Sequence, residues 1–471
     1  MNVLFIGLGR IGLPQSLVFA EAGHQVYGFD ADSSVICQLN SGIPSFEEPG
    51  LLELLTKHLN HGFKPCSHWH KLLPELDAVV FTIGASIKSA TDYLRDNVED
   101  LIEVKQLIHE IFSCPDQPPK PLLLVFRTTL LIGSMDRIKE YIHVNFNLDE
   151  GIDYLLAYVP ERLSEGNAVY EEQHLPKIIS GYSQASRQRA SDMFTVVGGK
   201  QFMVSSTRTA EFCKLVDNSY RNTIFGFANE LAMWASSCNV DVIEVINTVN
   251  ADYPRTNVPL PGFVSGYCLS KDPYIFDYGF PSKNAIRDVM SLWHLGRRVN
   301  DWLINYTVER VVSSCRSKGK ELASLRVAIL GLAFKADTDD FRMSHGFDLI
   351  DRLASEGVDN IVVYDPYLGK NRYTTIPEYY RRQGYAWVSS LEPQHFSAVD
   401  AVILATPHAI LKQQNPASLA VLLAKANSPV YIFDAWNIWR VLAEDGLSSS
   451  SPLLIYEGLG MAASQIGEVV S

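Results

Sequence analysis

Short, continuous runs of apolar residues alternate with stretches of helical spacing near both ends of the chain. At the start, an apolar run at residues 3–9 breaks into glycines, and after a helical stretch a second run at residues 25–30 ends in an acid. The same order returns at residues 327–333, around 347–355 and at 361–365. Because strands that are buried on both faces read as continuous apolar runs, this pattern predicts parallel sheets covered by helices on both sides.

The two ends share a third strand pattern at nearly the same distance. Asp77 opens the sequence Asp-Ala-Val-Val-Phe-Thr 70 residues after Gly7, and Asp400 opens Asp-Ala-Val-Ile-Leu-Ala-Thr 69 residues after Gly331. Such patterns recur by chance in α/β proteins, but the matched spacing favours two related domains. The predicted fold class is therefore α/β, with two Rossmann-like doubly wound domains.

The middle of the chain is predicted to be helical. Residues 206–237 and 282–318 lack proline and show helical spacing, and the apolar positions of the second stretch exceed one narrow stripe. It therefore packs on more than one neighbour, either as a spine that joins the domains and forms a subunit interface or as a core helix within one chain. We expect an N-terminal domain at 1–200, a central helical domain at 201–318 and a C-terminal domain at 319–471.

Charge and composition narrow the class of protein. A formal net charge of −13 argues against nonspecific nucleic-acid binding and against binding to an anionic membrane surface, so an anionic ligand needs a local cluster of cations. No apolar run approaches the roughly 20 residues of a membrane helix. The N-terminus has no positive segment before its apolar run, so it reads as a strand and not as a secretory signal.

The cysteines indicate a reducing compartment. There are seven of them, an odd and scattered set without a C-x-x-C pair, which speaks against a disulfide framework and against zinc or another metal site. We therefore expect a cytoplasmic protein with free thiols.

A glycine motif follows the first predicted strand. Residues 7–12, Gly7-Leu8-Gly9-Arg10-Ile11-Gly12, form G-x-G-x-x-G between a strand and a helix. Gly7 permits a tight turn, Gly9 lets backbone N–H groups approach a pyrophosphate, and Gly12 lets helix and strand pack closely. Asp30, 23 residues after Gly7, is placed to accept hydrogen bonds from a ribose diol and to repel a 2′-phosphate. The motif predicts NAD binding; residues 331–334, with Ala and Phe in the loop, are not expected to hold a second dinucleotide in this way.

Candidate chemistry lies in the middle of the chain. Cys268 sits in a glycine-flanked loop with Lys271 and Asp272 close behind, where a thiol can be exposed and activated. The other six cysteines are interpreted as small buried hydrophobes. Upstream, Lys214 and Asn218 share one helix face with other polar residues, and that face continues into apolar positions, so we expect it to point inward.

Taken together, seven motifs resemble the UDP-glucose/GDP-mannose dehydrogenase family over nearly the whole chain. They are Gly7-Leu8-Gly9-Arg10-Ile11-Gly12-Leu13-Pro14; Glu48-Pro49-Gly50-Leu51; Thr128-Thr129 with Gly133; Pro160-Glu161-Arg162-Leu163 with Glu165-Gly166; Ala210-Glu211 with Lys214, Asn218 and Arg221; Gly266, Cys268 and Asp272-Pro273; and Gly331-Leu332-Ala333-Phe334-Lys335 with Thr338-Asp339-Asp340, Arg342 and Ser344. Seven motifs in the family's order are far more specific than any one of them.

This resemblance implies a four-electron oxidation of a sugar's primary alcohol to a carboxylate, with two NAD per sugar. Cys268 would capture the intermediate aldehyde as a thiohemiacetal that is then oxidised to a thioester. The remaining catalytic roles would be oxyanion stabilisation by Lys214 and Asn218, water positioning or proton transfer by Asp272, thioester hydrolysis assisted by Glu161, and ordering of the water by Thr129. Structural roles remain the alternatives, with Asp272 as a helix cap and Glu161 paired with Arg162.

The resemblance also implies where the ligands bind. The C-terminal domain would hold the nucleotide of the sugar through Phe334 and Lys335, Arg342 would approach the NAD phosphates, and Arg255 would reach the substrate in a neighbouring subunit, which makes a homodimer the minimal active unit. The expected cofactor residues are Gly7, Gly9, Arg10, Ile11, Gly12, Asp30, Thr129 and Arg342; the expected substrate residues are Glu161, Arg162, Leu163, Glu165, Lys214, Asn218, Arg255, Gly266, Phe334 and Lys335.

Three departures from the family pattern concern the sugar pocket. Ser265 stands where glycine is usual, Tyr267 where His or Ser is common, and Trp436 where a substrate-contacting Arg is often found. A UDP-hexose and a UDP-N-acetylhexosamine both remain open. So do two other functions: a two-electron hydroxyacid-type dehydrogenase in which Cys268 is structural, and a nucleotide-sugar binder without catalysis.

Overall fold

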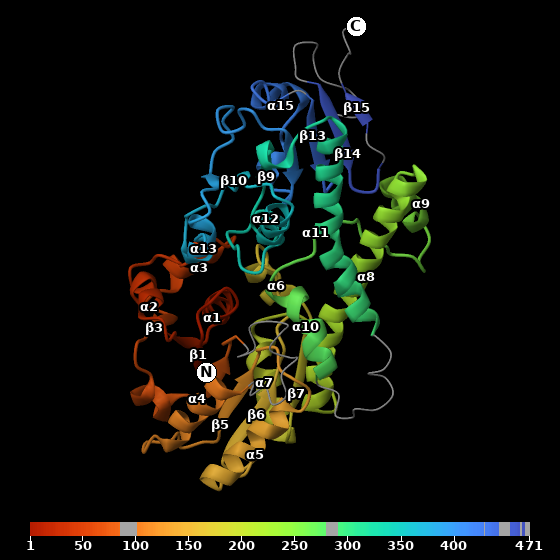
Figure 1. Cartoon of the computed structure of the whole chain (residues 1–471). Coiled ribbons are helices and arrows are strands. Elements are labelled where there is room, and N and C mark those ends of the chain that lie inside the picture. The colour runs from red at the N-terminus through yellow and green to blue at the C-terminus, as the bar shows by residue number, and fades with distance from the viewer. Residues whose placement is uncertain (85–100, 279–290, 428, 442–452, 462–463, 467–471) are drawn as a thin grey trace. The chain divides into compact units, whose positions relative to one another are not determined.

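The computed structural model describes residues 1–84, 101–278, 291–427, 429–441, 453–461 and 464–466 (Figure 1). The chain forms two compact units. The N-terminal unit comprises Met1–Asn218 with Tyr274–Lys283, and the C-terminal unit comprises Ser219–Pro273 with Asn284–Ser471.

The N-terminal unit is built on a mostly parallel sheet. Within the described residues its strand order is β3-β2-β1-β4-β5-β6-β7-β8, and β7 runs antiparallel to β6. The strands are β1 (Asn2–Ile6), β2 (Gln25–Phe29), β3 (Phe63–Pro65), β4 (Ala78–Phe81), β5 (Leu122–Phe126), β6 (Tyr154–Tyr158), β7 (Lys177–Gly181) and β8 (Gln201–Met203). The order reverses on either side of β1, so β1 and β4 flank the switch point where ligands of such sheets bind.

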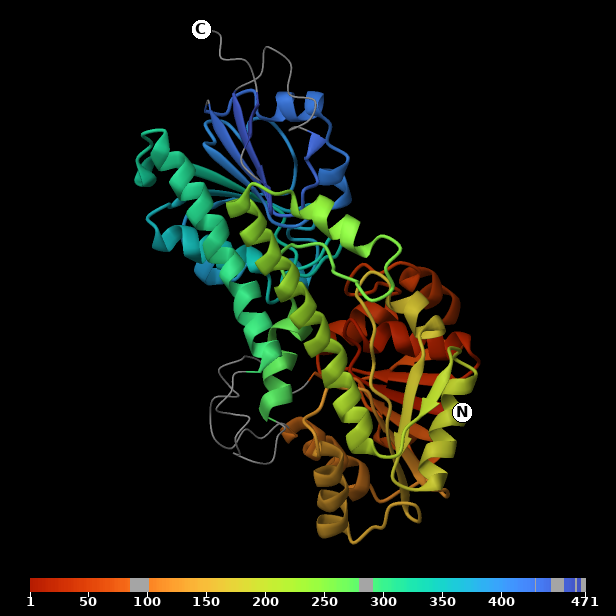
Figure 2. The same cartoon turned by 90° about the vertical axis from the view of Figure 1, so that its right-hand side faces the viewer.

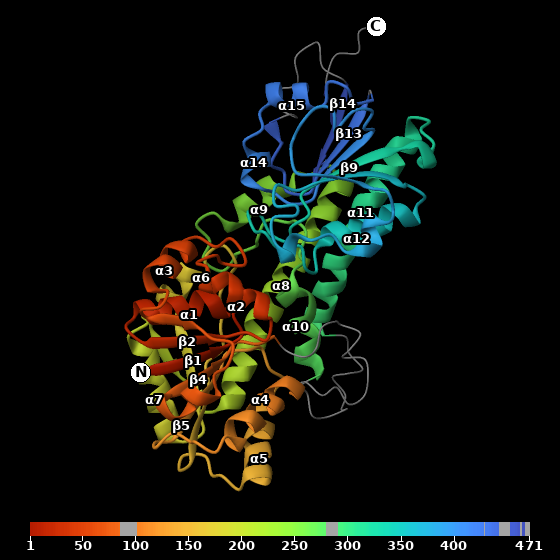
Figure 3. The ribbon, with the colours of Figure 1, turned by 90° about the vertical axis from the view of Figure 1, so that its left-hand side faces the viewer.

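Helices cover both faces of this sheet because alternate strand residues point to opposite sides. Leu4 and Ile6 pack in one apolar cluster with α4 and α5, whereas Phe5 meets Phe19 of α1, and Phe19 in turn meets Phe194 of α7. Figure 3 shows strands β1 and β4 between α1 and α5. The helices of this unit are α1 (Gly12–Glu21), α2 (Ser33–Asn40), α3 (Leu51–His58), α4 (Ile102–Ser113), α5 (Ser134–Phe146), α6 (Ala168–His174) and α7 (Gln184–Thr195).

The C-terminal unit repeats this architecture. Its strand order within the described residues is β11-β10-β9-β12-β13-β14-β15, parallel except for β15. The strands are β9 (Arg326–Leu330), β10 (Asn360–Tyr364), β11 (Ala386–Val388), β12 (Ala401–Leu404), β13 (Val430–Asp434), β14 (Leu454–Gly458) and β15 (Ser464–Ile466). Val327 and Ile329 pack with α11 and α12, and Ala328 and Leu330 pack on the opposite side with α14 and α15.

Two long helices meet in the C-terminal unit. Helix α8 (Thr207–Cys238) begins in the N-terminal unit and continues here beside α11 (Leu292–Ser317) (Figures 1 and 2). They cross where Gly226 faces Gly296: a methyl group on Gly226 would lie 2.7 Å from the Gly296 Cα, so only glycine permits this approach. The other helices are α9 (Val242–Asn250), α10 (Tyr267–Tyr278), α12 (His345–Ser355), α13 (Glu378–Arg381), α14 (Ala409–Lys412) and α15 (Pro416–Leu422).

The predicted fold class is confirmed. The six strands predicted from apolar runs are β1, β2, β4, β9, β10 and β12, and the helix predicted over 206–237 is α8. For the helix predicted over 282–318, the described part is α11, which Ser291 caps by accepting a hydrogen bond from the His294 N–H; residues 282–290 lie outside the described residues. The described part of α11 packs in the core of the C-terminal unit, as expected of a core helix within one chain. Its roles as a spine between the domains and in a subunit interface stay predictions.

Candidate active site

The glycine motif closes a tight turn at the carboxyl end of β1. Gly7 has φ +99° and donates its N–H to the Phe29 carbonyl of β2 at 2.8 Å. A methyl group on Gly12 would lie 1.8 Å from the Gly7 carbonyl oxygen, so α1 can begin here only with glycine. The result is a glycine-rich backbone cradle at the start of a helix, which fits a dinucleotide pyrophosphate.

Asp30 is tied to this cradle. One carboxylate oxygen accepts the Leu8 N–H at 2.8 Å, and the other accepts the Asp32 N–H at 2.9 Å. Asp30 is only half-buried, so it can also accept hydrogen bonds from ribose hydroxyls. The residues present therefore fit NAD.

Arg10 and Ile11 lie within the turn, and Arg10 joins it to a second segment. The guanidinium of Arg10 is 3.3 Å from the Glu165 carboxylate and 4.9 Å from the centre of the Phe46 ring. The carboxylate of Glu48 accepts the N–H groups of Gly166 and Ala168, both at 2.8 Å. The Glu48 motif thus fixes the loop that carries Glu165.

Glu161 and Lys214 form a buried ion pair in the N-terminal unit. The Lys214 ammonium donates to the backbone carbonyl of Glu161 at 2.6 Å and to its carboxylate at 3.0 Å. The second carboxylate oxygen of Glu161 accepts the Leu163 N–H at 2.9 Å. Sequence alone left a pairing of Glu161 with Arg162 open; instead Arg162 donates to the Pro176 carbonyl at 2.6 Å and lies 3.3 Å from the Asp217 carboxylate.

The expected inward face of α8 is buried at Lys214 and Asn218, but Arg221 on the same line is exposed. Glu211, also on this face, accepts the N–H groups of Gly133 and Met135 at 2.7 and 2.8 Å and so caps the start of α5. Burial raises the pKa of Glu211 to about 7 even though these two bonds oppose the shift. Thr129 is buried just beyond the carboxyl end of β5.

Cys268 lies in the first turn of α10, in the C-terminal unit, and is exposed. Three and four residues further along the chain, Lys271 and Asp272 are buried as an ion pair of 2.9 Å. Burial opposes the charge on Lys271, but the negative charges of Asp272 and Cys268 outweigh it and raise the pKa of this ammonium. The same attraction favours a thiolate at Cys268.

The loop after β9 lies against the Cys268 loop. Gly266 has φ +90° and donates its N–H to the Met343 carbonyl at 3.0 Å, and a methyl group on it would be 2.4 Å from the Phe334 ring. Half-buried Lys335 is next to Phe334. The guanidinium of Arg342 pairs with Asp340 and stands 5.9 Å from the centre of the Tyr267 ring. The C-terminal unit alone therefore brings Gly266 and Tyr267, the two residues before Cys268, beside the predicted ligand residues Phe334 and Arg342.

Arg255 lies in an exposed segment after α9, with its guanidinium 4.8 Å from the centre of the Tyr253 ring. Its predicted role in a neighbouring subunit stays a prediction, as does that of Arg342 toward NAD.

The second glycine loop differs from the first, as expected. Asp365 is the counterpart of Asp30 and accepts the Leu332 and Ala333 N–H groups at 2.7 and 2.9 Å. However, Asp365 is fully buried and His408 covers it at 3.1 Å. It therefore has no freedom to bind a ribose.

Sequence reasoning missed a buried polar group that supports the Cys268 loop. Asn229 of α8 donates to the Gly262 carbonyl at 2.9 Å and accepts its N–H at 2.8 Å, while Arg297 of α11 donates to the Val264 carbonyl at 2.9 Å. Asn300 of α11 accepts a hydrogen bond from Asn229 at 2.8 Å. The available signal was the spacing of Asn229 eleven residues after Asn218, three helical turns along one face of α8.

The cysteine interpretation needs one correction. Within the described residues all seven cysteines are free thiols; Cys315 is buried, but Cys37 and Cys238 are exposed, contrary to the expectation that all except Cys268 are buried. Both lie on outer faces of helices, and this exposure cannot be inferred from residue type.

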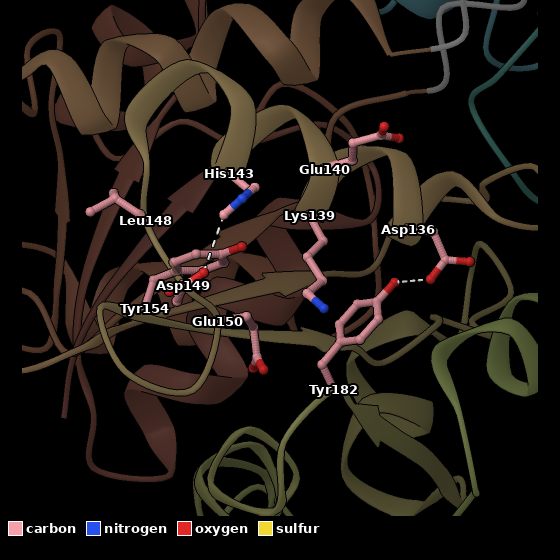
Figure 4. A pocket seen from close by; sticks show the side chains of 9 residues that line it. All are labelled: Asp136, Lys139, Glu140, His143, Leu148, Asp149, Glu150, Tyr154 and Tyr182. Atoms are coloured by element: carbon pink, nitrogen blue, oxygen red, sulfur yellow. Dashed lines mark hydrogen bonds and ion pairs between the residues drawn. The ribbon is translucent and has the colours of Figure 1, made fainter.

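A cavity of about 390 Å³ lies at the opposite, amino edge of the N-terminal sheet, where β6 begins with Tyr154 (Figure 4). Three of the carboxylates that line it have partners: Asp149 pairs with His143, Asp136 accepts a hydrogen bond from Tyr182, and Glu150 accepts one from Ser186. The dinucleotide cradle is at the carboxyl edge, so this cavity is not the candidate active site.

Two nucleotide-binding folds, one with a dinucleotide cradle and the other with an exposed thiol at its carboxyl edge, define a dinucleotide-dependent oxidoreductase. Family models agree. The UDP-glucose/GDP-mannose dehydrogenase family's NAD binding domain matches residues 1–197, its central domain matches 208–302 and its UDP binding domain matches 328–441.

Individual relatives agree as well. UDP-N-acetyl-D-mannosamine dehydrogenase of Pyrococcus horikoshii is 28% identical over 419 residues, 88% of this chain and 91% of that protein. NDP-N-acetyl-D-galactosaminuronic acid dehydrogenase of Ralstonia solanacearum is 28% identical over 376 residues, 78% of this chain and 83% of that protein. A solved structure of UDP-D-ManNAc dehydrogenase from Pyrococcus horikoshii matches with a TM-score of 0.81 at 26% identity and covers 98% of this chain and 99% of that one.

The chain belongs to the UDP-glucose/GDP-mannose dehydrogenase family, whose members are NAD-dependent nucleotide-sugar dehydrogenases. The resemblance inferred from the motifs is thereby confirmed, and so is NAD as the cofactor. Across the parts of the chain that the structure describes, no helix combines the length and apolarity needed to cross a membrane.

Proposed function

We propose that this enzyme oxidises the C6 alcohol of a UDP-linked N-acetylhexosamine to the uronic acid in two successive steps. The observation that carries the proposal is the exposed Cys268 thiol in the first turn of a helix, with the buried Lys271–Asp272 ion pair in the next turn. A hydroxyacid dehydrogenase needs no such thiol. Bound NAD supplies the hydride acceptor, and two molecules are consumed for each sugar.

The chemistry balances around Cys268. Loss of a hydride from C6 and of the hydroxyl proton yields an aldehyde. The thiolate adds to its carbonyl carbon, and the oxygen takes a proton to give a thiohemiacetal. Loss of a second hydride from C6, with that proton, leaves a thioester. Water then adds, the C–S bond breaks, and the thiol and a carboxylate are released.

The other groups act on oxygen and protons. Lys214 and Asn218 supply donors for the oxyanions that develop at C6. Asp272, held by Lys271, and Glu161, held by Lys214, serve as proton acceptors or as positioners of water. Thr129 orders the water that hydrolyses the thioester.

The substrate class is supported by the relatives. Those from Pyrococcus horikoshii and Ralstonia solanacearum carry names of 2-acetamido sugar dehydrogenases, and the UDP binding domain model matches the C-terminal region. Phe334 and Lys335 follow β9 at the carboxyl edge of that sheet, where open α/β sheets bind nucleotides. We assign the nucleotide to this edge, and we retain the division 1–200, 201–318 and 319–471 as part of the proposal.

We also propose a homodimer. Tyr220, Phe227 and Trp234 of α8 are 59%, 51% and 65% exposed, and their spacing of seven residues puts them along one face. Trp302 of α11 is 52% exposed. A second copy of this chain can bury such a stripe symmetrically.

The test is the stoichiometry of NADH. A panel of UDP- and GDP-sugars with NAD should give two NADH per sugar on the preferred substrate, which we expect to be UDP-N-acetylmannosamine or UDP-N-acetylgalactosamine. Cys268→Ala should lose turnover by about 1,000-fold or more, while the matched variant Cys238→Ala, also an exposed thiol on a helix, keeps it.

One NADH per sugar, or full turnover by Cys268→Ala, would instead identify a two-electron dehydrogenase. Sugar-nucleotide binding without any NADH would identify a binding protein.

A further inference from the structure

The five residues 262–266, which lie just before Tyr267 and Cys268, are each held by a contact within the C-terminal unit. Asn229 binds the backbone of Gly262, the ring of Phe263 stacks on His345 at 4.7 Å, Arg297 binds the Val264 carbonyl, Ser265 bonds to His345, and Gly266 donates to the Met343 carbonyl. Two of these five contacts are made by one side chain. His345 is therefore central to how this loop is built.

His345 bridges the loop to the C-terminal sheet. Its Nδ1 lies 2.7 Å from the Ser265 hydroxyl, and its Nε2 lies 2.7 Å from the Ala405 carbonyl oxygen, just past the end of β12. The ring is only 2% exposed. Two short bonds and a stacked face leave it no other orientation.

The hydrogen-bond partners of His345 determine which ring nitrogen carries a hydrogen. A carbonyl oxygen can only accept, so Nε2 carries hydrogen and donates to Ala405. In the neutral ring Nδ1 then accepts, and Ser265 donates its hydroxyl hydrogen. Burial lowers the pKa of His345 to about 4, which keeps this neutral form at physiological pH.

Trp436 joins the same bridge. Its indole N–H donates to the Ala405 carbonyl at 2.8 Å, so one carbonyl accepts from both His345 and Trp436. The indole also lies against Gly262, where an added methyl group would be 2.5 Å from the ring. Two of the three positions that depart from the family pattern, Ser265 and Trp436, thus meet through His345 and one carbonyl.

We propose that His345 is a positioning residue for the nucleophile: through Ser265 it holds the Cys268 loop on the carboxyl edge of the C-terminal sheet, with Trp436 as the second support. The turnover consequences rest on the proposed function, but the placement of the thiol can be tested without turnover.

The expected consequence lies in the first turn of α10. The Ser270 N–H bonds to the Gly266 carbonyl at 3.3 Å, so the loop residue before Tyr267 also begins the helix that carries Cys268. A helix N-terminus and a nearby ammonium, here Lys271, both favour a thiolate. Releasing Ser265 frays this turn, and the thiolate then forms only at higher pH.

The experiment measures alkylation of the full-length protein by iodoacetamide as a function of pH, with each cysteine quantified by peptide mass spectrometry. In Ser265→Ala and in His345→Phe, which keeps an aromatic ring over Phe263, the half-maximal pH at Cys268 should rise by about 0.5 unit. Exposed Cys37, in the other unit, is the internal reference and should not move. Ser265→Thr keeps the hydroxyl and should restore the wild-type profile.

A control separates positioning from general loss of stability. Tyr431→Phe removes a buried hydrogen bond to Glu457 in the same sheet. It should lower the free energy of unfolding and leave the Cys268 profile unchanged. If Tyr431→Phe raises the half-maximal pH at Cys268 as much as His345→Phe does, the effect comes from general loss of stability, and the proposal is overturned.

A double-mutant cycle tests whether the two residues act through one bond. The Ser265→Ala/His345→Phe double variant should shift the Cys268 profile no further than His345→Phe alone. Additive shifts, or no shift in either single variant, would overturn the proposal.

Turnover gives a second measurement once an active sugar nucleotide is known. Both single variants should then lower kcat about tenfold and leave KM for NAD unchanged. If the alkylation shifts are found but the wild-type protein turns over no sugar nucleotide, the proposed function is refuted and the positioning role of His345 is not.

Discussion

At the scale of single residues, the missing Cβ of Gly12 decides whether a helix can start where the first strand ends. A methyl group there would be 1.8 Å from the Gly7 carbonyl oxygen and 2.5 Å from the Thr82 hydroxyl. Both neighbours are fixed, because Thr82 itself donates to the Gly7 carbonyl at 2.7 Å. Neither can move without opening the turn.

Gly12→Ala should therefore weaken NAD binding at least about tenfold and destabilise the N-terminal unit by about 1–3 kcal/mol. The measurements are a calorimetric NAD titration and urea unfolding. Gly84→Ala is the matched control, since a methyl group there meets nothing within 4 Å and its backbone is not left-handed. Equal affinities of the two variants would contradict the crowding argument.

His345 gives a pH dependence of stability. The folded protein keeps its ring neutral down to a pKa of about 4, whereas an unfolded histidine takes up a proton near pH 6.5. The unfolded state thus binds more protons between these values, so stability is full above about pH 6.5 and falls as the pH is lowered.

Relative to His345→Gln, the wild-type free energy of unfolding should drop by up to about 3 kcal/mol between pH 6.5 and pH 4. Urea unfolding at a series of pH values measures this difference. Parallel pH curves for the two proteins would show that the ring is not buried as a neutral group.

Sequence could place individual residues on the right elements but could not give their partners. The glycine motif and Asp30 are local patterns, and they meet at the predicted turn. The bonds of Lys214 to Glu161 and of Ser265 to His345 span 53 and 80 residues, so only folding brings these groups together. The exposure of Cys37 and Cys238 was misjudged because residue type alone does not show which side of a helix faces solvent.

At the scale of elements, the six strands predicted from apolar runs, β1, β2, β4, β9, β10 and β12, are all present. All of them except β2 are buried along almost their whole length, as a continuous apolar run indicates. The other described strands were not predicted: β3, β8 and β11 are short and lack such runs, but β5, β6, β7 and β13 are buried throughout and were missed all the same. The close crossing of α8 and α11 also escaped prediction, because Gly226 and Gly296 each look like an isolated weak point in a helix.

Gly226→Ala tests that crossing. The added methyl group would lie 2.7 Å from the Gly296 backbone, so the helices must separate, and we expect the C-terminal unit to lose about 1–3 kcal/mol. Urea unfolding provides the measurement, with Ala235→Gly as the comparison, since it changes α8 by the opposite substitution at a partly buried position. A Gly226→Ala variant more stable than wild type, as helix propensity alone would give, would show that no close crossing exists.

At the scale of the whole molecule, the two related folds differ in whether the aspartate after their second strand is exposed or covered by another side chain. Asp30 and Asp365 both end the second strand of a sheet and both accept the N–H group that follows the first glycine. Asp30 is left half-buried, whereas Asp365 is sealed under His408. The repeat was visible in the sequence, but the covering residue lies 43 positions beyond Asp365 and could not be assigned to it.

The proposed homodimer makes a prediction at this same scale. Trp234→Glu with Phe227→Glu puts two charges into the exposed stripe of α8, so it should split a dimer into single chains without unfolding either one. Light scattering coupled to size-exclusion chromatography measures the mass. Val144→Glu on α5, also a highly exposed apolar position at 72%, is the control and should keep the wild-type mass. A wild-type mass of one chain would refute the dimer, and an unchanged mass in the double variant would show that the interface does not lie on α8.

Arg255→Ala adds a measurement of turnover. Separating the chains removes the partner's Arg255 from each site, and Arg255→Ala removes the same side chain while the dimer stays intact. If the double variant splits the dimer, Arg255→Ala should therefore lower turnover no more than the double variant does.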